Sequence, residues 1–346
     1  MKKLFFVTMA FLALSFILSG CGESKQKLYV YIWSDYIKQD LVKKFEKEFN
    51  CKVIMDFYDS NESMYAKLKA GAAGYDVAMP TGYMVQIMTT EGMIQEIDHT
   101  KISNIGNIDE AYLPFTLDPE MKVGVPYMIS NSGIGYLQSK VDDSFIPSLA
   151  VFDNPKYAGR MTMLNDMRET IGTALRFLGY SMNTTNLKEL EEAGDLLIRW
   201  KKNLAKFEAD LYKNGLISGE FIVSHGYNGD IFQLMTENDD IKYVIPQEGT
   251  TLSCDIMVIL KGSKNTELAY KFINYMLRPE VSAENMEYVY FIAPNKAAYD
   301  LVSEEVRNEP AVFLSPEVLK KSEVMIDLGE KNILFSNVWD RVKAAN

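Results

Sequence analysis

Cysteine and histidine are scarce in this chain. It contains three cysteines and two histidines among 346 residues, and neither His99 nor His225 has partners at a metal-ligand spacing. We therefore expect no metal site and no cofactor. Cys51 and Cys254 lie in apolar stretches about 200 residues apart. They could form one disulfide or stay as buried thiols, and the sequence leaves both alternatives open.

The sequence also lacks the short motifs of common enzyme classes. It has no Gly-x-Ser-x-Gly elbow, no Walker loop, no dinucleotide fingerprint and no His-Glu-x-x-His helix. We predict that the protein is not an enzyme. Basic residues are outnumbered, because 36 Lys and Arg stand against 47 Asp and Glu, a formal net charge of −11. This balance argues against a nucleic-acid partner, whose phosphates need a basic face, and it suits a cationic ligand.

Long apolar runs are missing except at the N-terminus. Lys2 and Lys3 precede an apolar stretch over residues 4–18, which is shorter than the roughly 20 residues of a membrane-spanning helix. The residues LSGC follow at 18–21, and this order resembles the signal sequence and lipobox of bacterial lipoproteins. In that family the cysteine is acylated and becomes the first mature residue, so the resemblance implies lipid at Cys21. An ordinary export signal followed by a chance cysteine is the alternative.

The lipoprotein resemblance divides the N-terminal region in two. Residues 1–20 would be the signal peptide, and residues 21–27 a short linker between lipid and fold. We expect a protein held at a bacterial membrane by the lipid on Cys21, facing the periplasm or the exterior. Without residues 1–20 the formal net charge becomes −13, and 326 residues remain. That length suggests about two domains.

Apolar patterning predicts alternating strands and helices. In the first part we expect strands at 28–33, 51–57 and 75–79 and helices at 41–49 and 62–69. This order is typical of a parallel sheet with helical crossovers. After Asn131 we expect strands at 135–137, 161–164, 221–223, 243–245 and 256–260, and helices at 170–178, 187–203 and 266–277. The sequence therefore predicts two α/β units.

Aromatic and acidic residues recur where predicted strands end, which is where α/β sheets bind ligands. These residues are Trp33, Ser34, Asp35 and Tyr36, Thr81 and Tyr83, Asp166 and Glu169, Tyr227 and Asp230, and Asp255. Carboxylates pair with ammonium groups, and aromatic faces attract the same cations. The pattern predicts a site for an elongated aliphatic amine with several positive charges.

Structural interpretations compete with this binding hypothesis. Asp166 and Glu169 are spaced almost as a capping box, and Asp230 or Asp35 could likewise serve a helix N-terminus. Trp33 and Tyr36 could be core aromatics. Asp255 is different, because it heads the predicted strand 256–260 with no Lys or Arg within five residues. A buried carboxylate is costly unless paired, so we expect a cationic ligand to supply its partner.

Longer stretches of the chain resemble one known family. They include YIWSDY at 31–36, GYDVAMP at 74–80 and FINYMLRPE at 272–280. These stretches are similar to those of the periplasmic spermidine/putrescine-binding proteins of ABC importers. The resemblance implies a two-lobe periplasmic-binding-protein fold of type II, with a mostly parallel sheet and flanking helices in each lobe and a hinge of crossing strands. It also implies a monomer that holds polyamine in the interlobe cleft and delivers it to an ABC permease.

The same resemblance implies boundaries and residue roles. The N-terminal lobe would comprise 28–131 and about 255–293, and the C-terminal lobe 132–254 and about 294–346. Trp33 and Tyr36 would lie along the ligand chain, with Ser34 and Asp35 hydrogen bonding beside them. Other positions that match hydroxyl or aromatic residues of the family are Thr81, Tyr83, Tyr227 (usually Trp) and Phe291 (usually Tyr). The matching carboxylates are Asp166, Glu169 and Asp255, which take ammonium groups, and Asp230, as in the putrescine-type members.

Two positions depart from the family pattern. Ser253 replaces an aromatic residue, and Met325 replaces a glutamine of the spermidine-type members, so the preferred polyamine length stays open. The alternatives for function are another cationic or small polar solute, such as a sugar, an anchored envelope hydrolase using Asp166 and Glu169, or an adhesin or sensor.

Overall fold

The computed structural model describes residues 25–71, 74–142, 145 and 147–345. The expected signal peptide and Cys21 lie outside this part of the chain. The predicted linker over 21–27 extends into the first strand. Strand β1 (Gln26–Trp33) already begins at Gln26, which pairs with Cys51. Within the described ranges, no helix is long and apolar enough to cross a membrane.

The first lobe is built on a parallel sheet, as the patterning predicts. Strand β1 lies between β2 (Cys51–Tyr58) and β3 (Val77–Ala78) and is parallel to both. Its crossovers are α2 (Gln39–Glu48) and α3 (Asn61–Lys69), and α4 (Gly82–Thr90) follows β3. Helix α2 forms because Leu41, Val42 and Phe45 recur on one face, which is buried.

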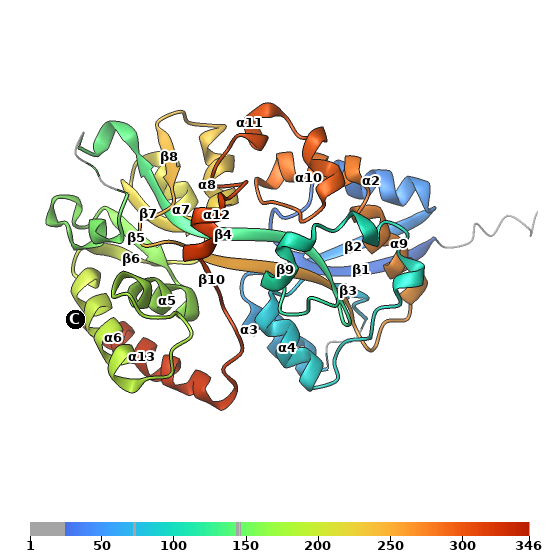
Figure 1. Ribbon diagram of the computed structural model, residues 1–346, viewed down its shortest axis with the longest axis horizontal. Helices are drawn as coiled ribbons and strands as arrows, with labels where there is room; N and C mark the ends of the chain where they lie inside the picture. The colour runs from blue at the N-terminus through green and yellow to red at the C-terminus, as the bar shows by residue number, and fades with distance from the viewer. Residues whose placement is uncertain (1–24, 72–73, 143–144, 146, 346) are drawn as a thin grey trace, which may run out of the picture.

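Two long strands cross between the lobes. Strands β4 (Val125–Leu137) and β9 (Thr251–Ile259) pair antiparallel, from Val125 opposite Met257 to Asn131 opposite Leu252. The far end of β9 pairs with β3 of the first lobe, and the far end of β4 pairs with β7 and β8 of the second. Figure 1 shows both strands running from one lobe into the other. The predicted lobe boundaries at 131/132 and 254/255 fall inside these two strands.

The second lobe repeats the α/β arrangement. Strand β5 (Met161–Leu164) is parallel to both β6 (Leu204–Glu208) and β7 (Val223–Tyr227), and β8 (Ile241–Val244) pairs with β4. The lobe's helices are α5 (Met167–Phe177), α6 (Leu187–Lys201), α7 (Tyr212–Ser218), α8 (Asn228–Met235) and α13 (Asn332–Ala344). The eight strands of the main path follow the order β2-β1-β3-β9-β4-β7-β5-β6.

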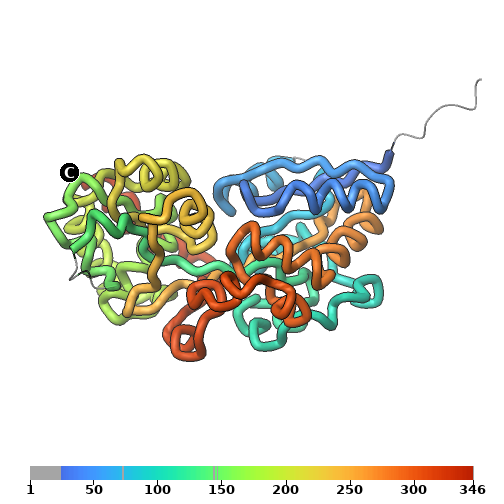
Figure 2. The backbone as a smooth tube through the Cα atoms, turned by 90° about the horizontal axis from the view of Figure 1, so that it is seen from above, coloured from blue at the N-terminus to red at the C-terminus, as the bar shows by residue number. Residues whose placement is uncertain are grey.

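The C-terminal part of the chain is shared between the lobes. Helices α9 (Thr266–Met276) and α10 (Pro279–Val289) belong to the first lobe, and Figure 2 shows this orange segment beside the blue N-terminal one. The structure differs from the predicted division after 293, because Ala298, Val302 and Val312 join the core of the first lobe. Helix α13, further along the chain, packs on α5 and α6 of the second lobe. Between α10 and α13 lie α11 (Glu304–Arg307), α12 (Pro316–Lys321) and β10 (Glu323–Val324).

Short 3₁₀ helices complete the connections. They span His99–Lys101, Ile105–Asn107, Glu110–Phe115, Gln138–Lys140, Leu149–Asp153, Pro155–Tyr157, Lys296–Leu301 and Gly329–Lys331.

The crossing strands are much longer than the patterning predicts. The strands expected at 135–137 and 256–260 are the ends of β4 and β9, and the preceding residues are also buried. Those residues include Ser130, Asn131 and Ser132, whose polar side chains hide a buried strand from an apolar pattern.

Gly133, on the crossing strand β4, lies very close to the neighbouring strand β8. A Cβ atom at this position would lie 2.6 Å from the carbonyl oxygen of Val244 on the neighbouring strand β8. We expect Gly133→Ala to lower the free energy of unfolding by about 1–3 kcal/mol, because the strands must move apart. Urea denaturation measures this loss. Gly106→Ala is the matched control, since a Cβ there meets no atom within 4 Å. Equal stability of the two variants would contradict the prediction.

Candidate functional site

Asp255 lies in the middle of β9, where the two lobes join. Thr81 Oγ1 donates to its Oδ1 at 2.6 Å, and the hydroxyl of Tyr36 donates to its Oδ2 at 2.6 Å. Thr81 is held in turn by Asn61, whose Nδ2 lies 3.1 Å from Thr81 Oγ1. Burial raises the pKa of Asp255 to about 6, and the two hydroxyl donors lower it in part. No cation contributes to this pKa among the residues that the structure describes.

Two expectations about Asp255 are wrong in detail. The residue does not head its strand, because β9 begins at Thr251. Its carboxylate does have partners, since Tyr36 and Thr81 both donate to it. Both donors are neutral, however, so they satisfy hydrogen bonds and leave the negative charge uncompensated.

Aromatic rings surround this carboxylate. Tyr36 meets Phe291 and Tyr127 edge-on, each with a ring separation of 5.4 Å. Trp33 is half-buried, donates from Nε1 to the carbonyl of Met79 at 3.1 Å, and packs on Tyr58 at 4.5 Å. The structure therefore places Trp33, Tyr36 and Phe291 in the region of Asp255. Each ring also packs against another aromatic ring, which agrees with the alternative that these residues are structural.

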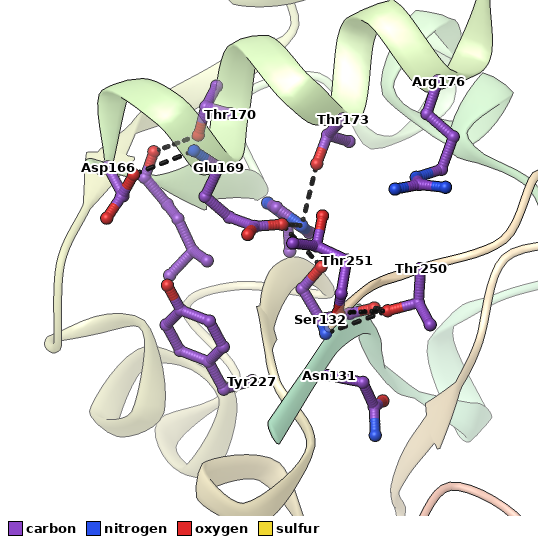
Figure 3. A network of polar contacts seen from close by, with 12 residues as sticks. Asn131, Ser132, Asp166, Glu169, Thr170, Thr173, Arg176, Tyr227, Thr250 and Thr251 are labelled. Atoms are coloured by element: carbon purple, nitrogen blue, oxygen red, sulfur yellow. Dashed lines mark hydrogen bonds and ion pairs between the residues drawn. The ribbon is translucent and has the colours of Figure 1, made fainter. Parts of the chain in front are cut away.

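Asp166 and Glu169 both lie at the start of α5 (Met167–Phe177), but their side chains point in different directions (Figure 3). Asp166 is the N-cap of α5 and accepts from the backbone N–H of Glu169 at 2.9 Å, which confirms the capping interpretation for Asp166. The Glu169 side chain does not complete a capping box. It extends away from Asp166 and accepts from Ser132 Oγ on β4 at 2.6 Å (Figure 3).

Glu169 is buried among mostly neutral groups. Burial raises its pKa to about 7, the hydrogen bond from Ser132 lowers it, and the charge of Asp166 raises it again. His225 Nε2 lies 3.7 Å from its carboxylate, but burial lowers the pKa of His225 to about 3 and keeps this ring neutral. Arg176 supplies only a minor lowering of the Glu169 pKa.

Residues of the first lobe face this carboxylate pair. The hydroxyl of Tyr83 on α4 donates to Glu62 at 2.9 Å. After burial, the charges of Glu62 and Asp166 are the largest causes that raise the pKa of Tyr83, and Asp166 likewise raises the pKa of Tyr227. Tyr83 and Tyr227, one from each lobe, therefore lie near Asp166. Glu62 was missed by the sequence analysis, because nothing distinguishes it from a solvent-facing glutamate in a helix.

The remaining predicted residues gather at another part of the lobe boundary. Asp230 lies in the first turn of α8 and accepts from the hydroxyl of Tyr212 at 2.7 Å. Burial raises the pKa of Asp230, and the charge of Lys213 and the hydrogen bond from Tyr212 lower it in part. Ser34 and Asp35 are exposed after β1, and Asp35 has φ 53°. Asp35 does not cap the following helix, whose N-cap is Lys38.

Cys51 and Cys254 are buried free thiols, so the disulfide alternative is wrong. Within the described ranges, no group of three or more His, Cys, Asp or Glu side chains is placed to hold a metal ion.

Comparison with known proteins gives a consistent family. The sequence model of the bacterial extracellular solute-binding proteins matches residues 40–314. A spermidine/putrescine-binding periplasmic protein of Salmonella typhimurium is 36% identical over 324 residues, which cover 93% of each chain. A putrescine-binding periplasmic protein of Pseudomonas aeruginosa is 35% identical over 366 residues, with 99% of this chain and 100% of the relative covered.

Solved structures agree with these sequence relatives. The TpPotD lipoprotein of Treponema pallidum superposes with a TM-score of 0.83 at 35% identity, covering 92% of this chain and 99% of that one. A putative spermidine/putrescine ABC transporter protein of Listeria monocytogenes superposes with a TM-score of 0.87 at 32% identity, covering 93% and 100%. The two-lobe solute-binding fold predicted from the sequence is therefore confirmed.

The raised pKa of Glu169 predicts a pH-dependent stability. The folded state keeps a proton on Glu169 up to about pH 7, whereas the unfolded state releases it near pH 4.5. Stability should therefore fall as pH rises through this window, by up to about 3 kcal/mol from this group. We expect Glu169→Gln to remove the part of this fall that Glu169 causes, while Asp255, whose pKa is also raised, keeps its own part. The variant should be more stable than wild type at pH 8. Thermal unfolding of the ligand-free protein from pH 4 to pH 8 measures it.

Glu191→Gln is the matched control for that experiment, because Glu191 is exposed on α6 of the same lobe. It should follow the wild-type curve. If Glu169→Gln also runs parallel to wild type at every pH, the buried-carboxyl account of Glu169 is wrong.

Proposed function

The chain belongs to the bacterial extracellular solute-binding protein family, and on this premise we propose that it captures putrescine or spermidine between its lobes. It delivers the polyamine to an ABC permease in the membrane and catalyses no reaction. The relatives named for these ligands are similar over almost the whole chain, which supports the same ligand class here.

Asp255 is the observation that carries this proposal. Its carboxylate is buried against Tyr36, whose ring packs on Phe291, and its hydrogen-bond donors are neutral hydroxyls. A carboxylate in such a place is stabilised when an ammonium group arrives, because the cation supplies the missing charge. The neighbouring rings attract the same cation and cover its methylene chain.

Asp166 and Glu169 provide the second anchor for the ligand. They lie on α5 of the second lobe, whereas Thr81 and Tyr83 come from the first. A diamine that reaches from Asp255 to this pair therefore contacts both lobes, and binding favours the closed arrangement over an open one. Its ammonium would lower the pKa of Glu169 and release the proton held there.

The competing functions have weaker support. A neutral sugar would leave the charges of Asp255, Asp166 and Glu169 unpaired. An envelope hydrolase would need two carboxyl groups free to act on a substrate, but Asp166 caps α5 and Glu169 accepts from Ser132. An adhesin or sensor would leave the acidic residues between the lobes without a role.

Calorimetric titration tests the proposal directly. The purified protein is titrated with putrescine, cadaverine, spermidine and spermine, and the mixtures are analysed by mass spectrometry for products. We expect saturable binding of at least one polyamine and unchanged ligand mass. Absence of binding to all four at millimolar concentration would refute the proposal, and a new product would refute the non-catalytic part.

Asp255→Asn gives a sharper prediction. The substitution keeps the size of the side chain and removes its charge, so a bound ammonium loses a charged acceptor. We expect polyamine affinity to fall by about 1.5–3 kcal/mol, which is roughly ten- to a hundredfold in Kd. The ligand-free variant should be at least as stable as wild type at pH 8, because a buried charge is gone.

Asp239→Asn is the control, since Asp239 is exposed and the change in net charge is the same. It should bind like wild type. If Asp255→Asn binds normally and is destabilised without ligand, Asp255 braces the fold and does not hold the ligand.

We propose further that the protein is exported to the periplasm or cell exterior and anchored by lipid on Cys21. The LSGC sequence at 18–21 and the similarity to a lipoprotein of Treponema pallidum support this location. Cys21→Ser should leave an unlipidated precursor or a soluble form, because no other residue replaces the acylated thiol. Detergent partitioning and intact-mass analysis measure it. An unmodified N-terminus elsewhere in the wild type would contradict the anchor.

A further inference from the structure

A third connection between the lobes accompanies the two crossing strands. Residues 326–332, here called the strap, lead from β10 to the start of α13, and Figure 1 shows this red segment passing between α5 and α4. Arg168 on α5 donates from Nη1 to the carbonyl of Ile326 at 3.2 Å and to Asn332 Oδ1 at 2.8 Å. Asn183 Oδ1, also of the second lobe, accepts from the Ile326 N–H at 3.1 Å. These bonds attach the strap to the second lobe.

A glutamine of the first lobe reaches the strap. Gln86 lies on α4, one turn after Tyr83, and its Oε1 accepts from the backbone N–H of Asp327 at 3.3 Å. The strap is shaped at this point by the Asp327 carboxylate, whose Oδ1 accepts from the N–H of Gly329 at 2.9 Å and from Asn332 Nδ2 at 3.1 Å. In the described ranges, no other hydrogen bond joins the strap to α4. A single polar contact between partly exposed residues therefore links the lobes here.

The lobes also meet where α8 packs on α10, and this junction is built differently. Asn228, the first residue of α8, is fully buried, and its Nδ2 donates to the carbonyl of Tyr290 in the first lobe at 2.9 Å. Its Oδ1 accepts from the N–H of Asn131 on β4 at 3.0 Å. A Cβ atom at Gly229 would lie 2.6 Å from the ring of Phe291. Separating this junction would leave buried polar groups unpaired, whereas separating the strap from α4 exposes both partners to water.

The two contacts lie on opposite sides of the crossing strands. Figure 1 shows α8 and α10 above β4 and β9, and α4 and α5 below them. A rotation about the α8–α10 junction therefore opens the lobes at the strap, where one hydrogen bond breaks. An interaction shifts the equilibrium between open and closed arrangements only when its strength differs between them. The bond to the strap meets this condition, and the junction does not.

We propose that the Gln86–Asp327 hydrogen bond is a latch that forms only in the closed arrangement and slows the release of bound polyamine. This inference rests on the proposed polyamine function and adds a residue outside the acidic and aromatic anchors. The ligand meets the open arrangement, where the latch is absent, so the rate of capture does not depend on Gln86. Release requires opening, so its rate rises when the latch is lost.

Gln86→Met tests the latch, because methionine keeps the length of the side chain and removes the acceptor. We expect the dissociation rate of putrescine to rise about three- to tenfold, as expected for one lost neutral hydrogen bond. The association rate should stay within about twofold of wild type. Stopped-flow fluorescence with putrescine, repeated with spermidine, measures both rates. Gln86→Ala is the second variant if the Met variant does not fold.

Gln233→Met is the matched control. Gln233 Nε2 on α8 donates to the carbonyl of Tyr288 on α10 at 3.1 Å, which is also a neutral hydrogen bond between the lobes but lies at the junction. Both rates in this variant should equal those of wild type. An unchanged dissociation rate in the Gln86 variants, a slower association that accounts for the lost affinity, or an equal rise in the control overturns the latch while polyamine binding itself stands. Wild type that binds neither ligand overturns the proposed function, and the latch with it.

Discussion

The antiparallel pairing of β4 with β9 is the interaction on which the rest of the structure depends. Strand β9 carries Asp255, one anchor of the candidate site, and β4 carries Ser132, which donates to Glu169 of the other anchor. Both strands also belong to the sheets of both lobes. Movement of one lobe against the other must bend these strands, together with the third connection that leads from Val312 to α13. Their backbone is held by polar side chains: Thr250 Oγ1 donates to the carbonyl of Ser132 at 2.6 Å, and Asn131 Nδ2 donates to the carbonyl of Ala311 at 2.7 Å. Such hydrogen bonds make this region resist random distortion.

Buried carboxylates are the second constraint. Asp255 and Glu169 have neutral hydroxyl donors, and burial raises the pKa of each. Such a site is less stable than one with an apolar residue in the same place, because the ionised groups lack a compensating charge. The proposed binding of a dication would offset this cost. Affinity for the ligand and instability of the empty site therefore have the same physical origin.

Glu169 connects these two constraints. Its carboxylate accepts from Ser132 on the hinge strand, while the helix that carries it is capped by Asp166 (Figure 3). A ligand ammonium at Glu169 would change the charge beside the hinge as well as the contact between lobes.

The sequence by itself determined the α/β class and most of the strands of both lobes, and its acidic and aromatic residues led to the proposed cationic ligand. Local patterns were sufficient there, because the apolar faces of β1, α2 and β5 depend on near neighbours in the chain. Tertiary structure decided the length of β4, whose buried polar residues follow no apolar pattern, and the partners of Asp255, since Tyr36 and Thr81 lie 219 and 174 residues away from it. It also decided that Glu62 approaches the candidate site, where the hydroxyl of Tyr83 donates to it. Charges act across space irrespective of sequence separation, so only the folded chain shows which carboxylates already have a cation and which still need one.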